Sequence, residues 1–235
     1  MAAWRLGKEF AMGAEWLLGL LKVMMINIVL SGDNAVVIAM ACRGLAPDRQ
    51  KKAIFWGTFG AVVLRLVLTF LAVWLLRIPM VEAVGGVLLL FIALKLLRGE
   101  EEAGPGKAGL SVGQAVKTIV MADVVMSLDN VVAVAGAAQG DWLLIGISLA
   151  VSIPLIIWCS QLLTGLMKRF PVIVWLGAGL LGYTAGEMLE KDEWVRGWLV
   201  PLLGDNTFLV PVATTAVVGV FGILSAKRGQ RRESQ

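Results

Sequence analysis

The sequence predicts an all-α integral membrane protein with about seven transmembrane helices, built as a 3+3 inverted repeat plus one extra helix. Composition is the first of three observations behind this prediction, since 58% of the 235 residues are hydrophobic and only 16% are charged. Soluble domains are about 45–50% apolar and about 25% charged. A soluble fold has no place for so much apolar surface, so we expect residues 1–235 to form one membrane domain in the lipid bilayer.

Apolar length is the second observation, because a membrane-spanning helix needs roughly 20 mostly apolar residues. Seven stretches are predicted to span the membrane, at 15–42, 54–76, 79–97, 114–138, 142–163, 172–189 and 206–226. Residues 98–113, which read RGEEEAGPGKAGLSVG, separate the third stretch from the fourth. The glycines, the proline and the acidic run of this segment are typical of a polar, solvated linker.

A near-duplication within the chain is the third observation. Residues 31–41 read SGDNAVVIAMA, and residues 127–137 read SLDNVVAVAGA. Both segments begin with Ser, place Asp and Asn together and continue into an apolar run. The alignment extends backwards along the chain and pairs Asn27 with Asp123.

The similarity continues more faintly into the spans that follow each motif. Residues 57–66 align with residues 146–155, which places Arg65 opposite Pro154. The weakest match pairs the segment VGGVLLLFIALK, which starts at position 84, with LGAGLLGYTAGE, which starts at position 176.

These matches divide the chain into repeat one at 15–97, repeat two at 114–189 and an extra span at 206–226. A unit of three helices ends on the opposite side of the membrane from its start, so its copy must be inserted upside down. Inverted repeats with binding residues near the bilayer midplane are typical of secondary transporters.

Lys and Arg residues are unevenly distributed between the two sides that the predicted spans define. Fourteen of the 21 fall on the side of the 98–113 linker and the C-terminal segment, and five fall on the other side. Because basic residues gather on the cytoplasmic side, we expect a multi-pass protein with its N-terminus outside, its C-terminus in the cytoplasm and the linker cytoplasmic.

Three aspartates lie inside the predicted spans, where an unpaired carboxylate costs at least about 3 kcal/mol. Hydrogen bonding between helices explains the neighbouring Ser and Asn side chains well and the aspartates poorly. The candidate metal ligands are Asp33, Asn34, Asp123, Asp129 and Asn130, and the candidate secondary ligands or gating residues are Asn27, Met126 and Arg65.

Helix geometry separates these side chains. At about 100° per residue, Asp33 lies about 120° around its helix from Asn27, and Asp129 lies about 120° around its helix from Asp123. One site gathers all the ligands only if each helix loosens locally, which Gly32 favours in the first span, whereas the motif of the fourth span has no glycine. Alternatively, the off-face aspartates reach neighbouring helices, where Arg65 is a counter-charge. The sequence leaves one site and two sites open.

Carboxylate and amide oxygens are hard ligands suited to Mg²⁺, Ca²⁺ or Mn²⁺. The chain has no histidine, and its two cysteines lie in apolar runs without a CxxC pattern, which argues against zinc or copper. A thioether from Met126 favours Mn²⁺ because sulfur is softer than oxygen, although methionine more commonly fills a gap between helices. We expect no cofactor, and Mn²⁺ or another divalent cation as a transported substrate.

Four segments resemble the TerC family of integral membrane proteins, in its YjbE-type branch: LSGDN at 30–34, ADVVMSLDN at 122–130, LRL around Arg65 and GAGLLGYTAGEM at 177–188. The resemblance covers essentially the whole chain. It implies export of a divalent metal, most often Mn²⁺, from the cytoplasm across the bacterial inner (plasma) membrane.

The family's paired Asp–Asn motifs fall on positions 33–34 and 129–130, and its upstream acidic position falls on Asp123. Asn27 departs from the family pattern at the matching position of the first repeat. Three aspartates suit a cation better than an anion such as tellurite.

Two other function classes stay open. An intramembrane aspartyl hydrolase would use Asp33 and Asp129 as a proton-sharing pair, although that reaction does not require an asparagine after each aspartate. A non-transporting scaffold would use the Asn and Ser side chains to hold helices together. No GxxxxGK[ST] motif is present, which argues against an ATP-driven pump.

The net charge of +4 indicates a basic cytoplasmic face rather than nucleic-acid binding. The oligomeric state stays open, with a homodimer as one option.

Overall fold

The computed structural model describes the chain in five segments, whose backbone covers residues 2–75, 78–98, 111–138, 141–204 and 206–233. Within these segments the side chains at 2–15, 72–75, 129, 135 and 225–233 lie outside the description. Most of the predicted linker at 98–113 also lies outside the described residues.

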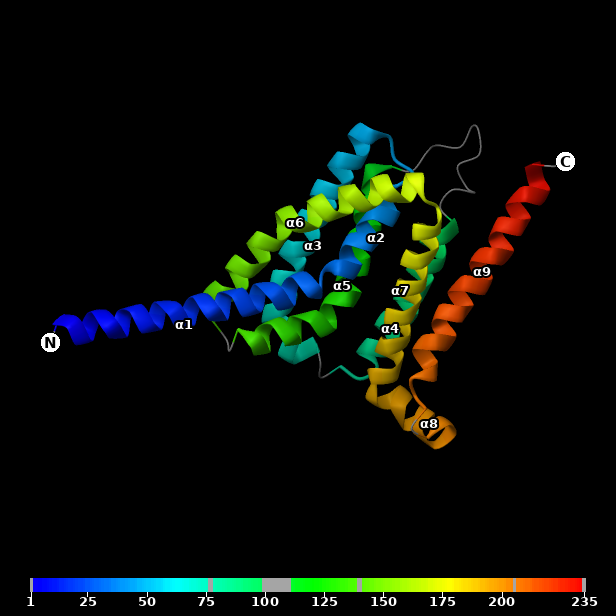
Figure 1. Ribbon diagram of the computed structural model, residues 1–235. Helices are drawn as coiled ribbons and strands as arrows, with labels where there is room; N and C mark the ends of the chain where they lie inside the picture. Colours follow the sequence, from blue (N-terminus) through cyan, green and yellow to red (C-terminus); the bar gives the residue numbers. More distant parts are fainter. Residues whose placement is uncertain (1, 76–77, 99–110, 139–140, 205, 234–235) are drawn as a thin grey trace.

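The described residues form nine helices and no strand (Figure 1), which confirms the all-α prediction. The helices are α1 (Ala2–Val29), α2 (Gly32–Cys42), α3 (Pro47–Leu75), α4 (Val81–Arg98), α5 (Val112–Ala137), α6 (Trp142–Arg169), α7 (Val172–Lys191), α8 (Glu193–Leu203) and α9 (Leu209–Glu233).

Three or four of these helices are long and apolar enough to cross a membrane. Helices α3, α6 and α7 qualify alone, and α1 with α2 qualifies as one broken span that bends by 41°. They overlap four of the predicted spans. Helices α4, α5 and α9 occupy the other three, but within the described residues they do not meet the same test of length and hydropathy. The count of seven spans and the inverted repeat therefore stay predictions.

The break between α1 and α2 lies at the first SxDN motif. Helix α1 ends at Val29 and α2 begins at Gly32, whereas α5 runs without interruption through the second motif. A glycine is tolerant of unusual backbone conformations, and the corresponding position of α5 holds Leu128. The local loosening that Gly32 favours is thus present in the first motif and absent from the second.

The helices pack in pairs around the two motifs. Helix α3 packs against α5, α1 and α2 pack against α6, and α4 packs against α7. Helix α2 also contacts α5, which brings the two motifs together, and α9 lies along α7 (Figure 1). Helix α8 connects the ends of α7 and α9 and buries none of its residues.

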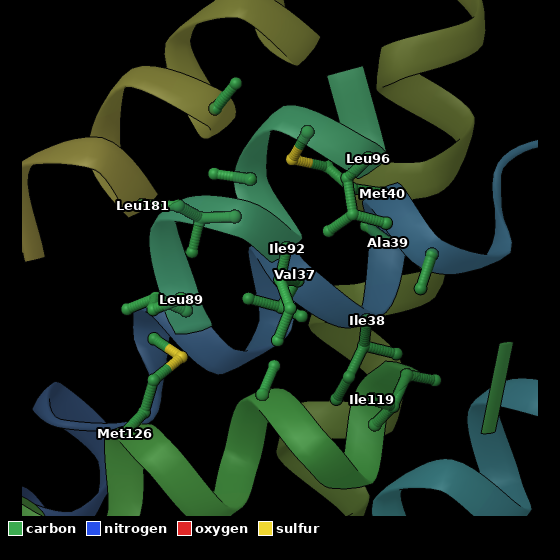
Figure 2. Close-up of a cluster of buried hydrophobic side chains, with 14 of the residues drawn as sticks. Val37, Ile38, Ala39, Met40, Leu89, Ile92, Leu96, Ile119, Met126 and Leu181 are labelled. Carbon is green, nitrogen blue, oxygen red and sulfur yellow. The ribbon is translucent and has the colours of Figure 1, made fainter. Parts of the chain in front are cut away.

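Most of the apolar core lies at one end of this bundle. It joins the C-terminal halves of α2 and α4 to the N-terminal halves of α5 and α7, through side chains such as Val37, Ile92, Ile119 and Leu181 (Figure 2). Large apolar side chains also cover the outside, and Trp158 is 62% exposed. Such a surface is favourable against lipid and unfavourable against water.

Candidate cation site

A cavity of about 570 Å³ lies beside the break between α1 and α2, at the opposite end of the bundle from most of the apolar core. Its walls come from the break itself, the start of α4, the C-terminal half of α5 and the C-terminal half of α7. The polar residues that line it are Asp33, Glu82, Asn130, Thr184, Glu187 and Lys191.

Asp33 and Asn130 meet this cavity where the two motifs come together. The backbone N–H of Asn34 donates a hydrogen bond to Oδ1 of Asp33 at 2.8 Å. In a continuous helix that N–H would bond to the carbonyl oxygen four residues earlier, that of Leu30. The Leu30 carbonyl instead accepts a hydrogen bond from Nδ2 of Asn130 at 3.2 Å. Asn130 therefore satisfies the backbone group that the break leaves open.

The thioether of Met126 also lines the cavity, one turn before Asn130 on α5. Both side chains are largely buried, at 4% and 7% exposed respectively. The two motifs thus bring one carboxylate, one amide and one thioether to the cavity. Glu82, Glu187, Lys191 and a second thioether, that of Met188, also line it.

A second polar cluster is built around Arg65 of α3, which is 2% exposed. Its guanidinium forms an ion pair with Asp123 of α5 through Nη2 and Oδ1. Nε donates to the hydroxyl of Ser127 at 2.9 Å, and Nη1 donates to the hydroxyl of Ser31 at 3.2 Å. The Ser127 hydroxyl donates in turn to Oδ2 of Asp123 at 3.0 Å. One arginine therefore links the serines of both motifs and balances one buried carboxylate.

Asn27 and Asn34 are not among the described residues that line the cavity. Asn27, which is 1% exposed, donates through Nδ2 to the carbonyl of Ser148 in α6 at 3.2 Å. Asn34 is 4% exposed, and neither of its side-chain amide atoms has a hydrogen-bond partner within the described residues. Position 129 lies in α5, but the side chain of Asp129 is outside the described residues. The proposed pairing of Asp33 with Asp129 in a hydrolase therefore stays a prediction.

The structure brings three of the eight predicted residues to one cavity: Asp33, Met126 and Asn130. It pairs Arg65 with Asp123, whereas the sequence alternative offered Arg65 as a counter-charge to Asp33 or Asp129. Among the described side chains, no group of three or more His, Cys, Asp or Glu residues lies close enough together to hold a metal ion. From the described side chains, a cation near Asp33 would therefore take neutral oxygen or sulfur ligands.

Sequence reasoning missed the acidic walls of the cavity. Glu82 and Glu187 both lie within the predicted spans, at 79–97 and 172–189, and both line the cavity. Ionisable residues inside a membrane span are functional candidates by default. That rule, applied to every predicted span rather than to the repeated motif alone, would have found them.

Comparison with known proteins decides the family. The sequence model of the integral membrane protein TerC family matches residues 12–233. The chain belongs to the TerC family. Its TerC relatives include the uncharacterized membrane protein YjbE of Bacillus subtilis, which is 43% identical over 204 residues, covering 87% of this chain and 93% of YjbE. The resemblance seen in the sequence motifs is therefore confirmed.

Longer proteins also match. The inner membrane protein YoaE of Escherichia coli strain K12 is 28% identical over 186 residues, which is 71% of this chain and 36% of YoaE. YkoY of B. subtilis is 25% identical and matches 66% of this chain. No solved structure matches this TerC protein.

Proposed function

We propose that this TerC family protein is a secondary transporter that exports a divalent metal cation, with Mn²⁺ as its cargo, from the bacterial cytoplasm. One observation carries the proposal: Asp33 and Asn130 meet at a helix break that lies on a cavity. In secondary transporters, cation sites form near the bilayer midplane at such broken helices.

The proposed ligands at the break have the chemistry of a Mn²⁺ site. Asp33 supplies a carboxylate, Asn130 an amide oxygen and Met126 a thioether, all lining the same cavity. Only one of the two carboxylate oxygens of Asp33 accepts a described hydrogen bond. Carboxylate and amide oxygens suit Mg²⁺, Ca²⁺ and Mn²⁺ alike, and a thioether favours Mn²⁺ among the three.

Asp123 has a different proposed role from Asp33. Its charge is balanced by Arg65, and both its oxygens accept hydrogen bonds from that arginine or from Ser127. We assign Asp123 and Arg65 to holding α3 against α5 beside the site. Asp129 and Asn34 stay candidate ligands on the strength of the repeated motif.

Helix packing supports an inverted-repeat transporter. If α1–α4 and α5–α7 are copies, then α3 against α5 is equivalent to α6 against α1 and α2, and both contacts are present. The α4–α7 contact and the α2–α5 contact each join a helix to its counterpart in the other repeat, so exchanging the two repeats leaves both contacts unchanged. Rocking of one such repeat against the other gives alternating access.

The acidic walls of the cavity favour a cation path. Glu82 and Glu187 line it between the break and the end of the bundle near α8. With the orientation that the basic residues predict, that end faces the outside. The state described here is then open outward. Two carboxylates, Glu82 and Glu187, and one ammonium, Lys191, line this part of the cavity, so its lining keeps a negative charge that favours a cation.

The test is Mn²⁺ accumulation in cells that lack their own Mn²⁺ exporters. Wild type should lower cytoplasmic Mn²⁺, and Asp33→Asn should export at least about tenfold more slowly because a charged ligand is lost at nearly constant shape. Asp129→Asn tests the second motif in the same assay. Glu193→Gln is the control, because it removes an exposed carboxylate of α8 outside the cavity. Normal export by Asp33→Asn at equal expression would refute the assigned site.

A further inference from the structure

Asn34 is an unexplained polar group in the middle of the bundle. It is 4% exposed, and neither Oδ1 nor Nδ2 of its side chain has a hydrogen-bond partner among the side chains and backbone that the structure describes. Buried polar side chains in native proteins are nearly always hydrogen-bonded. The amide of Asn34 is therefore available to a partner that another arrangement of the chain supplies.

The repeat identifies that partner. In the motif alignment, Asn34 corresponds to Asn130 and Leu30 corresponds to Met126. Asn130 donates to the Leu30 carbonyl, which the break between α1 and α2 leaves open. The equivalent bond would run from Asn34 to the Met126 carbonyl. That carbonyl lies inside the continuous helix α5, where it belongs to the helical hydrogen-bond ladder.

The two ends of the bundle differ in the same reciprocal way. Val37 corresponds to Ala133 in the motif alignment, and Ile92 corresponds to Thr184 in the fainter one. Ala133 and Thr184 line the cavity. Val37 and Ile92 are 2% and 5% exposed in the core that closes the opposite end (Figure 2). These two positions therefore line the cavity in repeat two, and their counterparts in repeat one are packed in the core.

We propose that α5 breaks at Met126–Ser127 in a second state while α1 and α2 join into a straight span, so that Asn34 caps the Met126 carbonyl and a cavity opens at the Val37 end. This exchange rests on the proposed inverted-repeat transporter and supplies its conformational step. Each state breaks one motif helix and uses one asparagine as a cap, so the two states make the same number of cap bonds.

Arg65 is placed to serve both states. It donates to Ser31 at the existing break and to Ser127 at the proposed one. The arginine network can therefore hold the two motifs together while the break moves from one helix to the other. Leu128, which replaces glycine at the second break and is 8% exposed, favours the continuous α5 seen here.

Thiol labelling tests the exchange without any transport measurement. Cys42 and Cys159 are first replaced by alanine, and Val37→Cys or Ala133→Cys is introduced as a probe of each end. A membrane-impermeant maleimide is then added to either side of sealed vesicles that contain the full chain. Val37→Cys reports the proposed state, and Ala133→Cys reports the present one.

Asn34→Ala and Asn130→Ala form a matched pair. Removing the Asn34 cap should slow labelling of Val37→Cys, and removing the Asn130 cap should accelerate it, each by about fivefold, the population shift expected for one buried hydrogen bond. Ala133→Cys should change in the opposite sense. Leu128→Gly should accelerate Val37→Cys labelling, because glycine weakens the helix at the proposed break.

The outcomes separate this inference from the proposed function. If both asparagine variants, purified as folded protein, shift Val37→Cys labelling in the same direction or leave it unchanged, the exchange is refuted. If the reciprocal shifts occur but wild type exports no Mn²⁺, the conformational exchange stands and the cargo assignment fails.

Discussion

At the scale of single residues, the intramembrane carboxylates have different environments. Asp123 is 5% exposed and pairs with Arg65, whereas Asp33 lines a cavity and accepts from a backbone N–H. The aligned positions of the other repeat, Asn27 and Pro154, are both uncharged. The pair formed by Arg65 of repeat one and Asp123 of repeat two is therefore charged on both sides, whereas the equivalent positions, Pro154 of repeat two and Asn27 of repeat one, are both neutral.

Arg65→Met should destabilise the protein by about 3–5 kcal/mol, because it leaves the buried Asp123 carboxylate without its counter-charge. The double variant Arg65→Met with Asp123→Asn should recover most of this loss, since it reproduces a neutral arrangement. Thermal unfolding of the single and double variants in detergent measures both effects. A double variant no more stable than Arg65→Met alone would contradict the assigned pairing.

At the scale of helices, the proposed function depends on the broken span and on the continuous α5. Gly32 begins α2 directly after the break, and a Cβ atom added there meets nothing within 4 Å. Close packing therefore does not require this glycine, and what glycine contributes at the break is its low helix propensity. A residue at position 32 that fits the space but favours a helical backbone should affect the break between α1 and α2 without disturbing the packing around it.

Gly32→Ala should lower Mn²⁺ export by about fivefold with little change in thermal stability, because alanine favours a helical backbone by about 1 kcal/mol over glycine. Gly165→Ala in α6 is the matched control, since it also adds a methyl group in open space within a helix. Transport and unfolding are measured on the same preparations. Equal export by the two variants would show that the break needs no glycine.

Helix α7 approaches α9 closely through glycines. A Cβ atom added at Gly186 would meet the backbone of Pro211 and the hydroxyl of Thr214, whereas one added at Gly179 would lie 3.8 Å from Thr215. Small residues allow such close contact between helices in membranes.

Gly186→Ala should therefore destabilise the packing of α9 on α7 by about 1–3 kcal/mol, and Gly179→Ala should not. Thermal unfolding and limited proteolysis of α9 check this difference. Equal stability of the two variants would mean that α9 adjusts its position without cost.

At the scale of the whole molecule, the bundle is open at one end and packed at the other. The cavity occupies the end near α8, and the cluster around Val37 and Ile92 occupies the opposite end. A cavity at one end and tight packing at the other are expected of one state of an alternating-access transporter. A scaffold has no need of a cavity with carboxylate walls.

Mn²⁺ should raise the unfolding temperature of the purified protein, because a ligand that binds only the folded state adds about 2.7 kcal/mol at a hundredfold excess over its Kd. The shift should be absent in Asp33→Asn and retained in Glu193→Gln. The scaffold hypothesis predicts no shift in any of the three proteins, so the absence of stabilisation in wild type would favour it.

Much of the fold followed from local properties of the chain. Apolar length and the dearth of charge predict helices in a membrane, because only helices and closed barrels satisfy the backbone in lipid. The prediction of a loosened helix at Gly32 was also local, since it depends on the backbone freedom of one residue type. The repeated motif brought Asp33 and Asn130 to notice through residue identity alone.

By itself, the sequence determined that this protein is an α-helical TerC family membrane protein with polar motifs buried in two of its helices. Only the tertiary structure decided that Asn130 caps the break at Leu30, that Asp123 belongs to Arg65, and that Glu82 and Glu187 line the same cavity as Asp33. The physical reason is that these pairings depend on how each helix is rotated and where it breaks. Residue spacing within one helix defines its faces, but not which neighbour each face meets.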